Sequence, residues 1–467
     1  MGAQPEYTIL TSENELHMKQ ILLLGAGRSA SSLINYLLKL IEEKNWQLTI
    51  GDVAITHLPE HLLQHPQVKA IEFNIHHEEQ VRVEVSEADL VISLLPAAFH
   101  KFVAAACLVQ QKNLITASYV SPEIREMHQQ AKTDNLIFLM ECGLDPGIDH
   151  MSAMQVIHEL QEKGAQLKSF KSYTGGLIAP ESDNNPWHYK ITWNPRNVVL
   201  AGQGVAKYLK EGQFKYIPYH QLFKRTDRLQ VLEFGEFDGY ANRDSLSYRQ
   251  PYGLDNIPTI LRGTLRRRGY CQSWNALVQL GLTDDSYTLE NAHELTYHQL
   301  TESFLPAFHD STADLRTRLA IYLNLEPDSE EIQNLEWLGL FSDEKIGLEK
   351  PTPAQVLEKI VVQKWKLQPG DKDMIVMQHL FEYELQGKEY LHTSSMVVLG
   401  DDAVQTGMAK TVGLPVGIAA KLILEGKVNQ KGVIIPTSKE LYEPILEELK
   451  EYGINFVEEV KEKQQAN

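Results

Sequence analysis

The sequence predicts an α/β protein that has a doubly wound parallel sheet at its N-terminal end and a second α/β domain with a helical insertion. Strand and helix patterns alternate over residues 19–142, which is typical of successive βαβ units. At 467 residues with 43% hydrophobic residues, the chain is long enough for two or three well-packed domains. After Asp149 the alternation gives way to a mixed region rich in Gly, Pro, Tyr and Arg. We therefore expect the second domain to begin near that point.

The first strand-turn-helix carries a phosphate-binding pattern. The apolar run Ile21–Leu24 leads into Gly25-Ala26-Gly27-Arg28-Ser29-Ala30, and an apolar helical pattern follows. Gly25 permits the tight turn, Gly27 lets the backbone approach a pyrophosphate, and Ala30 allows the helix to pack close to the strand. The pattern predicts a Rossmann-type dinucleotide site, although a glycine-rich turn without a nucleotide is the alternative reading.

The second predicted strand favours NAD as the dinucleotide. It runs through Gln47–Asp52 and ends in an acidic residue 25 positions after Gly27. A carboxylate at this place accepts hydrogen bonds from the ribose hydroxyls of NAD and repels the 2′-phosphate of NADP. Asp52 is therefore the predicted determinant of cofactor choice, with NADP kept as the alternative cofactor.

The remaining elements follow in order. The other predicted strands of the first sheet are Ala70–Phe73, Leu90–Leu94, Asn113–Thr116 and Ile137–Met140. The loop after Leu90–Leu94 would lie at the carboxyl edge of the sheet, beside the nicotinamide. Beyond it, residues 150–165 read as a helix, 283–366 as mostly helical, and 373–385 as a strand followed by further α/β segments.

Composition excludes several classes of function. A net charge of −18 argues against nucleic acid or an anionic membrane as a partner. Three widely spaced cysteines (Cys107, Cys142 and Cys271) indicate neither a disulfide framework nor a zinc site, and no other metal site is predicted. No apolar run reaches the roughly 18 residues that span a bilayer, and the polar residues before Met18 read as a flexible leader rather than a signal peptide. We expect a cytoplasmic protein.

Arginines gather in the second domain although positive charge is scarce in the chain. They are Arg196, Arg243, Arg262, Arg266, Arg267 and Arg268. Because a guanidinium matches a carboxylate with two parallel hydrogen bonds, this distribution predicts a pocket for a polycarboxylate. The alternative is that these arginines pair with surplus acids at the surface. Arg243 and Arg262 are the better candidates, since both are expected in loops near glycines.

Several polar runs resemble the saccharopine dehydrogenases that form L-glutamate, also called saccharopine reductases. The runs are GLDPGIDH (Gly143–His150), SYTGG (Ser172–Gly176), NRDS (Asn242–Ser245), RGTLR (Arg262–Arg266) and EWLGLFSDEKI (Glu336–Ile346). The resemblance extends from about residue 19 to the C-terminus. It implies a Rossmann domain over 18–142 with a returning segment near 405–430, a saccharopine-binding and dimerising domain over 143–282 and 367–467, and a helical insertion over 283–366.

The resemblance also implies site residues, and homodimers as the assembly. On the cofactor side these are Ala26, Gly27, Arg28 and Ser29, with Leu95 near the nicotinamide, and they join Gly25 and Asp52, which the strand and turn patterns predict. On the substrate side they are Ser118, Tyr119, Asp145, Arg243, Thr264, Leu265 and Arg266. The chain departs from the fungal pattern at Asp52-Val53, where fungal members carry Cys-Arg, and at Thr174, where a cysteine is usual. The first departure favours NAD, and the second puts one pocket contact in doubt.

The implied reaction oxidises saccharopine with NAD and water to glutamate and 2-aminoadipate 6-semialdehyde. An acid-base group near the reacting carbon would serve it. Asp145 is the candidate, with a purely orienting role as the alternative, while His100 and His150 are expected to be structural. The rival functions are an NADP-dependent reductase working toward lysine, a catalytically inactive Rossmann binding protein, and a carboxynorspermidine-type dehydrogenase.

Overall fold

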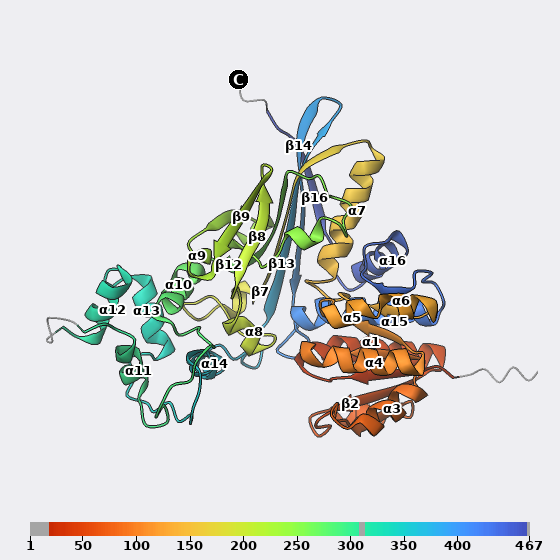
Figure 1. The fold of residues 1–467 in the computed structure, drawn as a ribbon, viewed down its shortest axis with the longest axis horizontal. Coiled ribbons are helices and arrows are strands. Elements are labelled where there is room, and N and C mark those ends of the chain that lie inside the picture. The colour runs from red at the N-terminus through yellow and green to blue at the C-terminus, as the bar shows by residue number, and fades with distance from the viewer. Residues whose placement is uncertain (1–17, 308–312, 465–467) are drawn as a thin grey trace, which may run out of the picture.

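The computed structural model describes residues 18–307 and 313–464, so the predicted leader before Met18 lies outside the described residues. The first domain is built on a seven-stranded parallel sheet with strand order β15-β6-β5-β4-β1-β2-β3 (Figure 1). Its strands are β1 (Gln20–Leu24), β2 (Gln47–Asp52), β3 (Val68–Glu72), β4 (Leu90–Ser93), β5 (Asn113–Thr116), β6 (Ile137–Leu139) and β15 (Gly432–Ile434). The predicted parallel sheet is confirmed. The chain order reverses between β1 and β4, which is where open α/β sheets bind their ligands.

Helices cover both faces of this sheet. They are α1 (Ser31–Lys44), α2 (Glu60–Leu63), α3 (Glu78–Glu87), α4 (His100–Gln110), α5 (Pro122–Glu126), α6 (His128–Thr133) and α15 (Gly407–Leu424). Alternate residues of β1 point to opposite faces, as a strand requires. Ile21 and Leu23 share a core with α1 and α15, whereas Leu22 and Leu24 pack with α3 and α4. All four side chains are buried.

The helix α15 returns to the first domain from the far end of the chain, as its place among the N-terminal helices in Figure 1 shows. Glycines make the close approach to α1 possible. A Cβ on Gly417 would lie 2.5 Å from the ring of Tyr36, and one on Gly413 would lie 2.9 Å from the backbone of Leu33. Among the described residues, α15 is the one helix long and apolar enough to cross a membrane, and 83% of that window is buried inside the protein.

The returning segment is longer than the sequence predicts. Residues after 430 were expected in the second domain, but β15 pairs in parallel with β6, with Val433 opposite Phe138. The reason is that β6 would otherwise present an unpaired edge, and the short apolar strand Gly432–Ile434 covers it.

The second domain contains a nine-stranded mixed sheet. Its main path is β10-β11-β12-β7-β13-β14-β16, with β8 and β9 joined at β12. The strands are β7 (Gln166–Ile178), β8 (Val205–Lys210), β9 (Gln213–Pro218), β10 (Thr226–Gln230), β11 (Glu236–Ala241), β12 (Thr259–Arg267), β13 (Asp373–Leu385), β14 (Lys388–Leu399) and β16 (Val457–Glu462). The helices α7 (Ile148–Glu162) and α16 (Lys439–Lys450) lie on the side that faces the first domain (Figure 1).

The other side of this sheet carries the predominantly helical region. Its helices are α8 (Pro195–Val199), α9 (Tyr219–Leu222), α10 (Tyr270–Leu280), α11 (Tyr297–Ser303), α12 (Leu315–Leu323), α13 (Glu330–Leu338) and α14 (Pro353–Lys364). Thr296 and Thr352 begin α11 and α14 with capping boxes, which satisfy the first free N–H groups. Three buried tryptophans, Trp187, Trp274 and Trp365, pack against one another in the core that these helices share with the sheet.

Candidate active site

A cleft of ≈ 720 Å³ separates the two domains at the carboxyl edge of the first sheet. The first domain contributes Tyr119 and Glu141, which follow β5 and β6. The second domain contributes Arg243, Tyr248 and Arg262. The returning segment closes one end through 433–435 and Thr437. Residues of all three segments therefore meet in one concave site.

The turn between β6 and α7 places Asp145 against this site. Gly147 has a φ of 151°, and a Cβ there would lie 1.9 Å from the carbonyl oxygen of Gly143, so the turn accepts only glycine. The backbone N–H of Gly147 donates to Asp149 Oδ1 at 2.6 Å. Asp149 thereby fixes the turn that presents Asp145.

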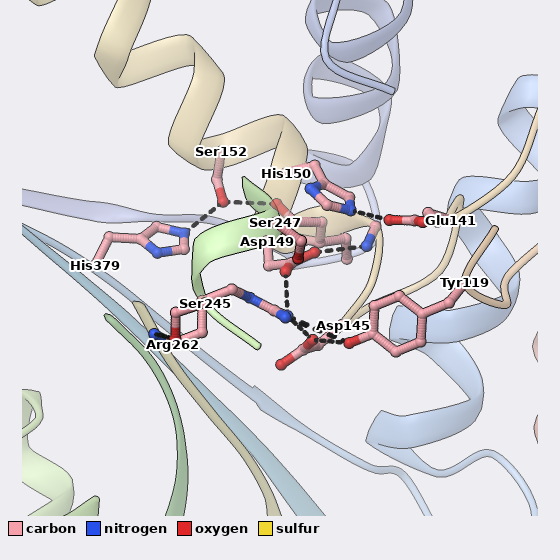
Figure 2. A network of polar contacts seen from close by, with 12 residues as sticks. Tyr119, Glu141, Asp145, Asp149, His150, Ser152, Ser245, Ser247, Arg262 and His379 are labelled. Carbon is pink, nitrogen blue, oxygen red and sulfur yellow. Dashed lines mark hydrogen bonds and ion pairs between the residues drawn. The ribbon is translucent and has the colours of Figure 1, made fainter. Parts of the chain in front are cut away.

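Arg262 joins the acidic residues of this turn (Figure 2). Its Nη2 donates to Asp145 Oδ1 and, at 2.8 Å, to Asp149 Oδ2. The Tyr119 hydroxyl donates to the same Asp145 oxygen at 3.1 Å. The guanidinium also stacks on the ring of Tyr248 at 3.9 Å. One buried guanidinium nitrogen thus serves two carboxylates, and Asp145 receives two donors from different domains.

This arrangement shifts the ionisation of Asp145. Burial disfavours the carboxylate and raises its pKa, Arg262 opposes the rise, and the neighbouring Asp149 carboxylate adds to it. The net direction is a raised pKa. A carboxyl group with a raised pKa holds a proton more readily than an ordinary Asp, which favours a role in proton exchange. The pKa of the Tyr119 hydroxyl is also raised, chiefly by burial, so Tyr119 stays a hydrogen-bond donor.

Glu141 and His150 form a second buried pair in the wall of the cleft. His150 Nε2 lies 2.8 Å from Glu141 Oε2, and His150 Nδ1 lies 2.8 Å from the hydroxyl of Tyr252. Burial lowers the pKa of His150, but Asp149 and Glu141 outweigh it and the net direction is upward. Burial likewise acts to raise the pKa of Glu141, and the bond from His150 reverses this to a net lowering. Both ring nitrogens of His150 are therefore occupied by hydrogen bonds to side chains of the protein.

Ser118 and His100 lie beside this pair. The Ser118 hydroxyl is 2.8 Å from His100 Nε2, and Ser93 Oγ is 2.9 Å from His100 Nδ1. Burial lowers the pKa of His100 to about 4, so the imidazole is neutral at physiological pH. His100 thereby positions Ser118, whose predicted contact with substrate stays a prediction.

The two best arginine candidates occupy different settings. Arg243 follows β11 in a loop, as expected, is exposed, and faces the cleft. Arg262 was expected in a loop but lies inside β12, and it is 5% exposed. The adjacent glycine explains the difference, because a Cβ on Gly263 would lie 2.4 Å from the ring of Tyr173. Gly263 is required for close packing of the sheet and does not mark a turn.

The structure does not bring Arg266 to the cleft walls. It is 3% exposed, its guanidinium lies 5.1 Å from the ring centre of Tyr189 and 5.3 Å from that of Tyr270, and it donates to the carbonyl of Leu265. Leu265 is fully buried and Thr264 half-buried in the same strand. Their predicted roles as substrate contacts stay predictions.

The glycine-rich loop fits a dinucleotide. Gly25 has a φ of 95°, and a Cβ there would lie 2.9 Å from the backbone of Leu94, beside the predicted nicotinamide contact Leu95. A Cβ on Gly27 would meet nothing within 4 Å, so the loop is open on the side of the expected pyrophosphate. Arg28 and Ser29 lie in the short 3₁₀ turn that precedes α1.

Asp52 lies against this loop. Its Oδ2 accepts the backbone N–H of Ala26 at 2.7 Å. A second cleft of ≈ 580 Å³ opens beside it at the ends of β2 and β3 and is lined by Val53, Glu72, Phe73, Asn74, His77 and Gln80. The Asp52 carboxylate is placed to meet the ribose of a bound dinucleotide, and the cleft beside it is placed to hold the attached base.

Sequence reasoning missed two residues of the site. Asp149 is part of the quoted GLDPGIDH run, and its position two residues after Gly147 was the available signal. Arg125 of α5 also lines the interdomain cleft, and no motif marks it.

The fold and the site define a dinucleotide-binding, two-domain protein of the oxidoreductase type. Comparison with known proteins identifies its family. Residues 21–139 match the family model "Saccharopine dehydrogenase NADP binding domain", and residues 143–454 match "Saccharopine dehydrogenase C-terminal domain". The chain belongs to the saccharopine dehydrogenase family.

Named relatives agree with this assignment. The chain is 35% identical over 446 residues to the mitochondrial alpha-aminoadipic semialdehyde synthase of Bos taurus, covering 94% of this chain and 47% of that protein. It therefore spans about half the length of that relative. It is 34% identical to the saccharopine dehydrogenase [NADP(+), L-glutamate-forming] of Schizosaccharomyces pombe, covering 95% and 99%. The structure of apo saccharopine dehydrogenase (L-Glu forming) from Saccharomyces cerevisiae superposes with a TM-score of 0.84 at 32% identity, covering 95% and 100%.

Proposed function

We propose that this protein is an L-glutamate-forming saccharopine dehydrogenase that oxidises saccharopine with NAD⁺ and water. The observation that carries the proposal is the Arg262–Asp145–Tyr119 network, in which Arg262 and Tyr119 line the interdomain cleft at the carboxyl edge of the dinucleotide-binding sheet. Family membership supports the same reaction. The products are glutamate and 2-aminoadipate 6-semialdehyde.

The bound dinucleotide would accept the hydride that leaves the lysine-side carbon of the secondary amine. That loss of two electrons converts the C–N bond of the substrate to an imine, and the amine must be neutral for this to happen. Water then adds to the imine carbon, and cleavage of the C–N bond releases glutamate. Two residues are placed to assist. Asp145, with its raised pKa, can take the amine proton or hold the amine by a hydrogen bond, and Tyr119 can donate to the developing oxygen.

The cofactor preference that we propose is NAD. Asp52 and Glu72 both lie at the ends of strands beside the second cleft, and no lysine or arginine is among the residues that line it. A 2′-phosphate would therefore meet negative charge and no cation, which costs on the order of 1–3 kcal/mol. The fungal relatives are named for NADP(+), so an NADP-dependent reductase is the second candidate.

One absorbance assay tests both statements. Saccharopine should reduce NAD with a kcat/KM at least ~tenfold above that for NADP. Asp52→Ala combined with Val53→Arg should shift the preference toward NADP, while Asp52→Ala alone, the matched control, should only weaken the preference. Equal use of both cofactors by the unmodified protein would contradict the role of Asp52. No turnover with either cofactor would favour the inactive binding protein.

Homodimers and a cytoplasmic location are further proposals, carried by the resemblance and by the sequence composition respectively. Sedimentation equilibrium of the full chain tests the first, and a tagged copy imaged in its own cell tests the second.

A further inference from the structure

The interdomain cleft holds two arginines that the protein itself leaves without a carboxylate. Arg125 lies on α5 of the first domain, and Arg243 follows β11 of the second. Both are exposed, and within the described part of the chain neither guanidinium has an ion-pair partner. This is unexpected in a chain of 62 acidic and 44 basic residues, where acids outnumber the available cations.

The acidic residues that share the cleft, or lie against it, already have partners within the protein. Glu141 pairs with His150 at 2.8 Å, and Asp244 pairs with Lys207 at 2.7 Å. Arg262 is shared between Asp145 and Asp149 behind Tyr119. Among the described residues, Arg125 and Arg243, one on each domain, are therefore the arginines of the cleft wall that have no ionic partner.

We propose that Arg125 binds one carboxylate of the substrate while Arg243 binds another, so that the substrate bridges the two domains. This inference rests on the proposed function. Saccharopine has three carboxylates, one primary ammonium and the secondary amine, and its reactive form with that amine neutral carries two net negative charges. The two unpaired arginines match this charge. Each can form a bidentate pair with a carboxylate, which a lysine cannot reproduce.

The bridge also explains where specificity arises. A ligand with a single carboxylate can satisfy one wall of the cleft only and leaves the other guanidinium unpaired. Arg125 would therefore select for polycarboxylates without touching the reacting carbon. Its loss should raise KM for saccharopine and leave kcat nearly unchanged, since the pair is equally present before and during the reaction.

The test measures saccharopine oxidation and, separately, calorimetric binding of saccharopine to the protein with NADH present. We expect Arg125→Ala to raise the saccharopine KM and Kd about 10- to 100-fold, with the NAD KM within twofold. Arg125→Lys should recover only part of the loss. The matched control is Arg225→Ala, which removes an exposed arginine outside the cleft and should change nothing. In the Arg125→Ala, Arg243→Ala double variant the two losses should multiply, because the carboxylates are different.

The outcomes separate this inference from the function on which it rests. If the unmodified protein binds saccharopine without oxidising it, the proposed function fails, and the binding series still decides the role of Arg125. An Arg125→Ala protein with unchanged saccharopine Kd and KM overturns the bridge. A double variant no worse than Arg243→Ala overturns it as well, because both arginines would then serve one carboxylate.

Discussion

Replacing Arg262 with methionine should destabilise the protein in a pH-dependent way. The change keeps much of the side-chain volume but leaves Asp145 and Asp149 buried without their shared cation. Breaking a buried pair by removing one partner costs about 3–5 kcal/mol. The variant can limit this cost by protonating one carboxyl, which for an ordinary Asp pKa near 3.9 costs about 4 kcal/mol at pH 7. We therefore expect a loss of about 4 kcal/mol at pH 7.

The sign of the pH dependence follows from the same carboxyl. In the variant its folded-state pKa lies above the unfolded value, so the folded state binds the extra proton and stability falls as pH rises. The loss should shrink to roughly 1–2 kcal/mol at pH 5. Urea unfolding followed by tryptophan fluorescence at pH 5, 6 and 7, always relative to the unmodified protein, measures it. Arg243→Met, which removes an exposed and unpaired arginine, is the control and should stay within about 0.5 kcal/mol.

Two results would refute this reasoning. A loss of the same size at pH 5 and pH 7 would mean that packing on Tyr248, and not charge, is what Arg262 contributes. A loss below about 1 kcal/mol at pH 7 would mean that the two carboxylates are solvated in the folded protein. Adding Asp145→Asn to Arg262→Met should recover most of the loss at pH 7, because the carboxyl that would have to be protonated is gone.

Three further predictions concern single positions. If Asp145 transfers protons, Asp145→Asn should lower kcat about 10²–10⁴-fold and abolish one limb of the pH–rate profile. If Asp145 only orients the amine, the loss in kcat should be smaller and the profile should keep its shape. Unaltered kinetics across pH would exclude both roles. Arg243→Ala should lower kcat/KM for saccharopine by an amount that corresponds to roughly 2–4 kcal/mol of transition-state binding, while the NAD affinity measured by calorimetry is retained. A parallel loss of NAD binding would assign Arg243 to the cofactor site or to the fold. Burial lowers the pKa values of His100 and His379 to about 4, so the unfolded chain takes up protons before the folded one as the pH falls. The free energy of unfolding should therefore fall between pH 6.5 and pH 4 by about 3 kcal/mol for each histidine. His379→Gln should remove one such contribution, and an unchanged dependence of stability on pH in that variant would contradict the prediction.

Local pattern was enough to predict the first domain, because a buried parallel strand and an amphipathic helix each have their own periodicity. The run Ile21–Leu24 and the turn Gly25–Ala30 are the clearest case, and both lie where the sequence places them. The turn around Asp145 could also be predicted, because Gly143 and Gly147 supply the backbone freedom that a tight turn needs. These features depend on residues that are neighbours in the chain.

Features that depend on distant residues were not predicted. The setting of Arg262 is one, since its partners lie more than a hundred positions away and no spacing rule connects them. Arg125 is another, because α5 alone does not show that Arg243 of the other domain shares its cleft. The placement of β15 is a third, since a strand of three residues does not reveal which sheet edge it covers.

The return of α15 and β15 has a consequence for synthesis on the ribosome. The edge strand β6 ends at Leu139, but the strand that covers it begins at Gly432, and α1 packs against a helix that begins at Gly407. A nascent chain that has emerged only as far as β13 therefore exposes one apolar face of its first sheet together with an unpaired strand edge. Such surfaces recruit chaperones or aggregate. The second domain still waits for β16, which begins at Val457, so the first domain stays incomplete although it is made first, and both domains finish folding only after the C-terminal segment has emerged.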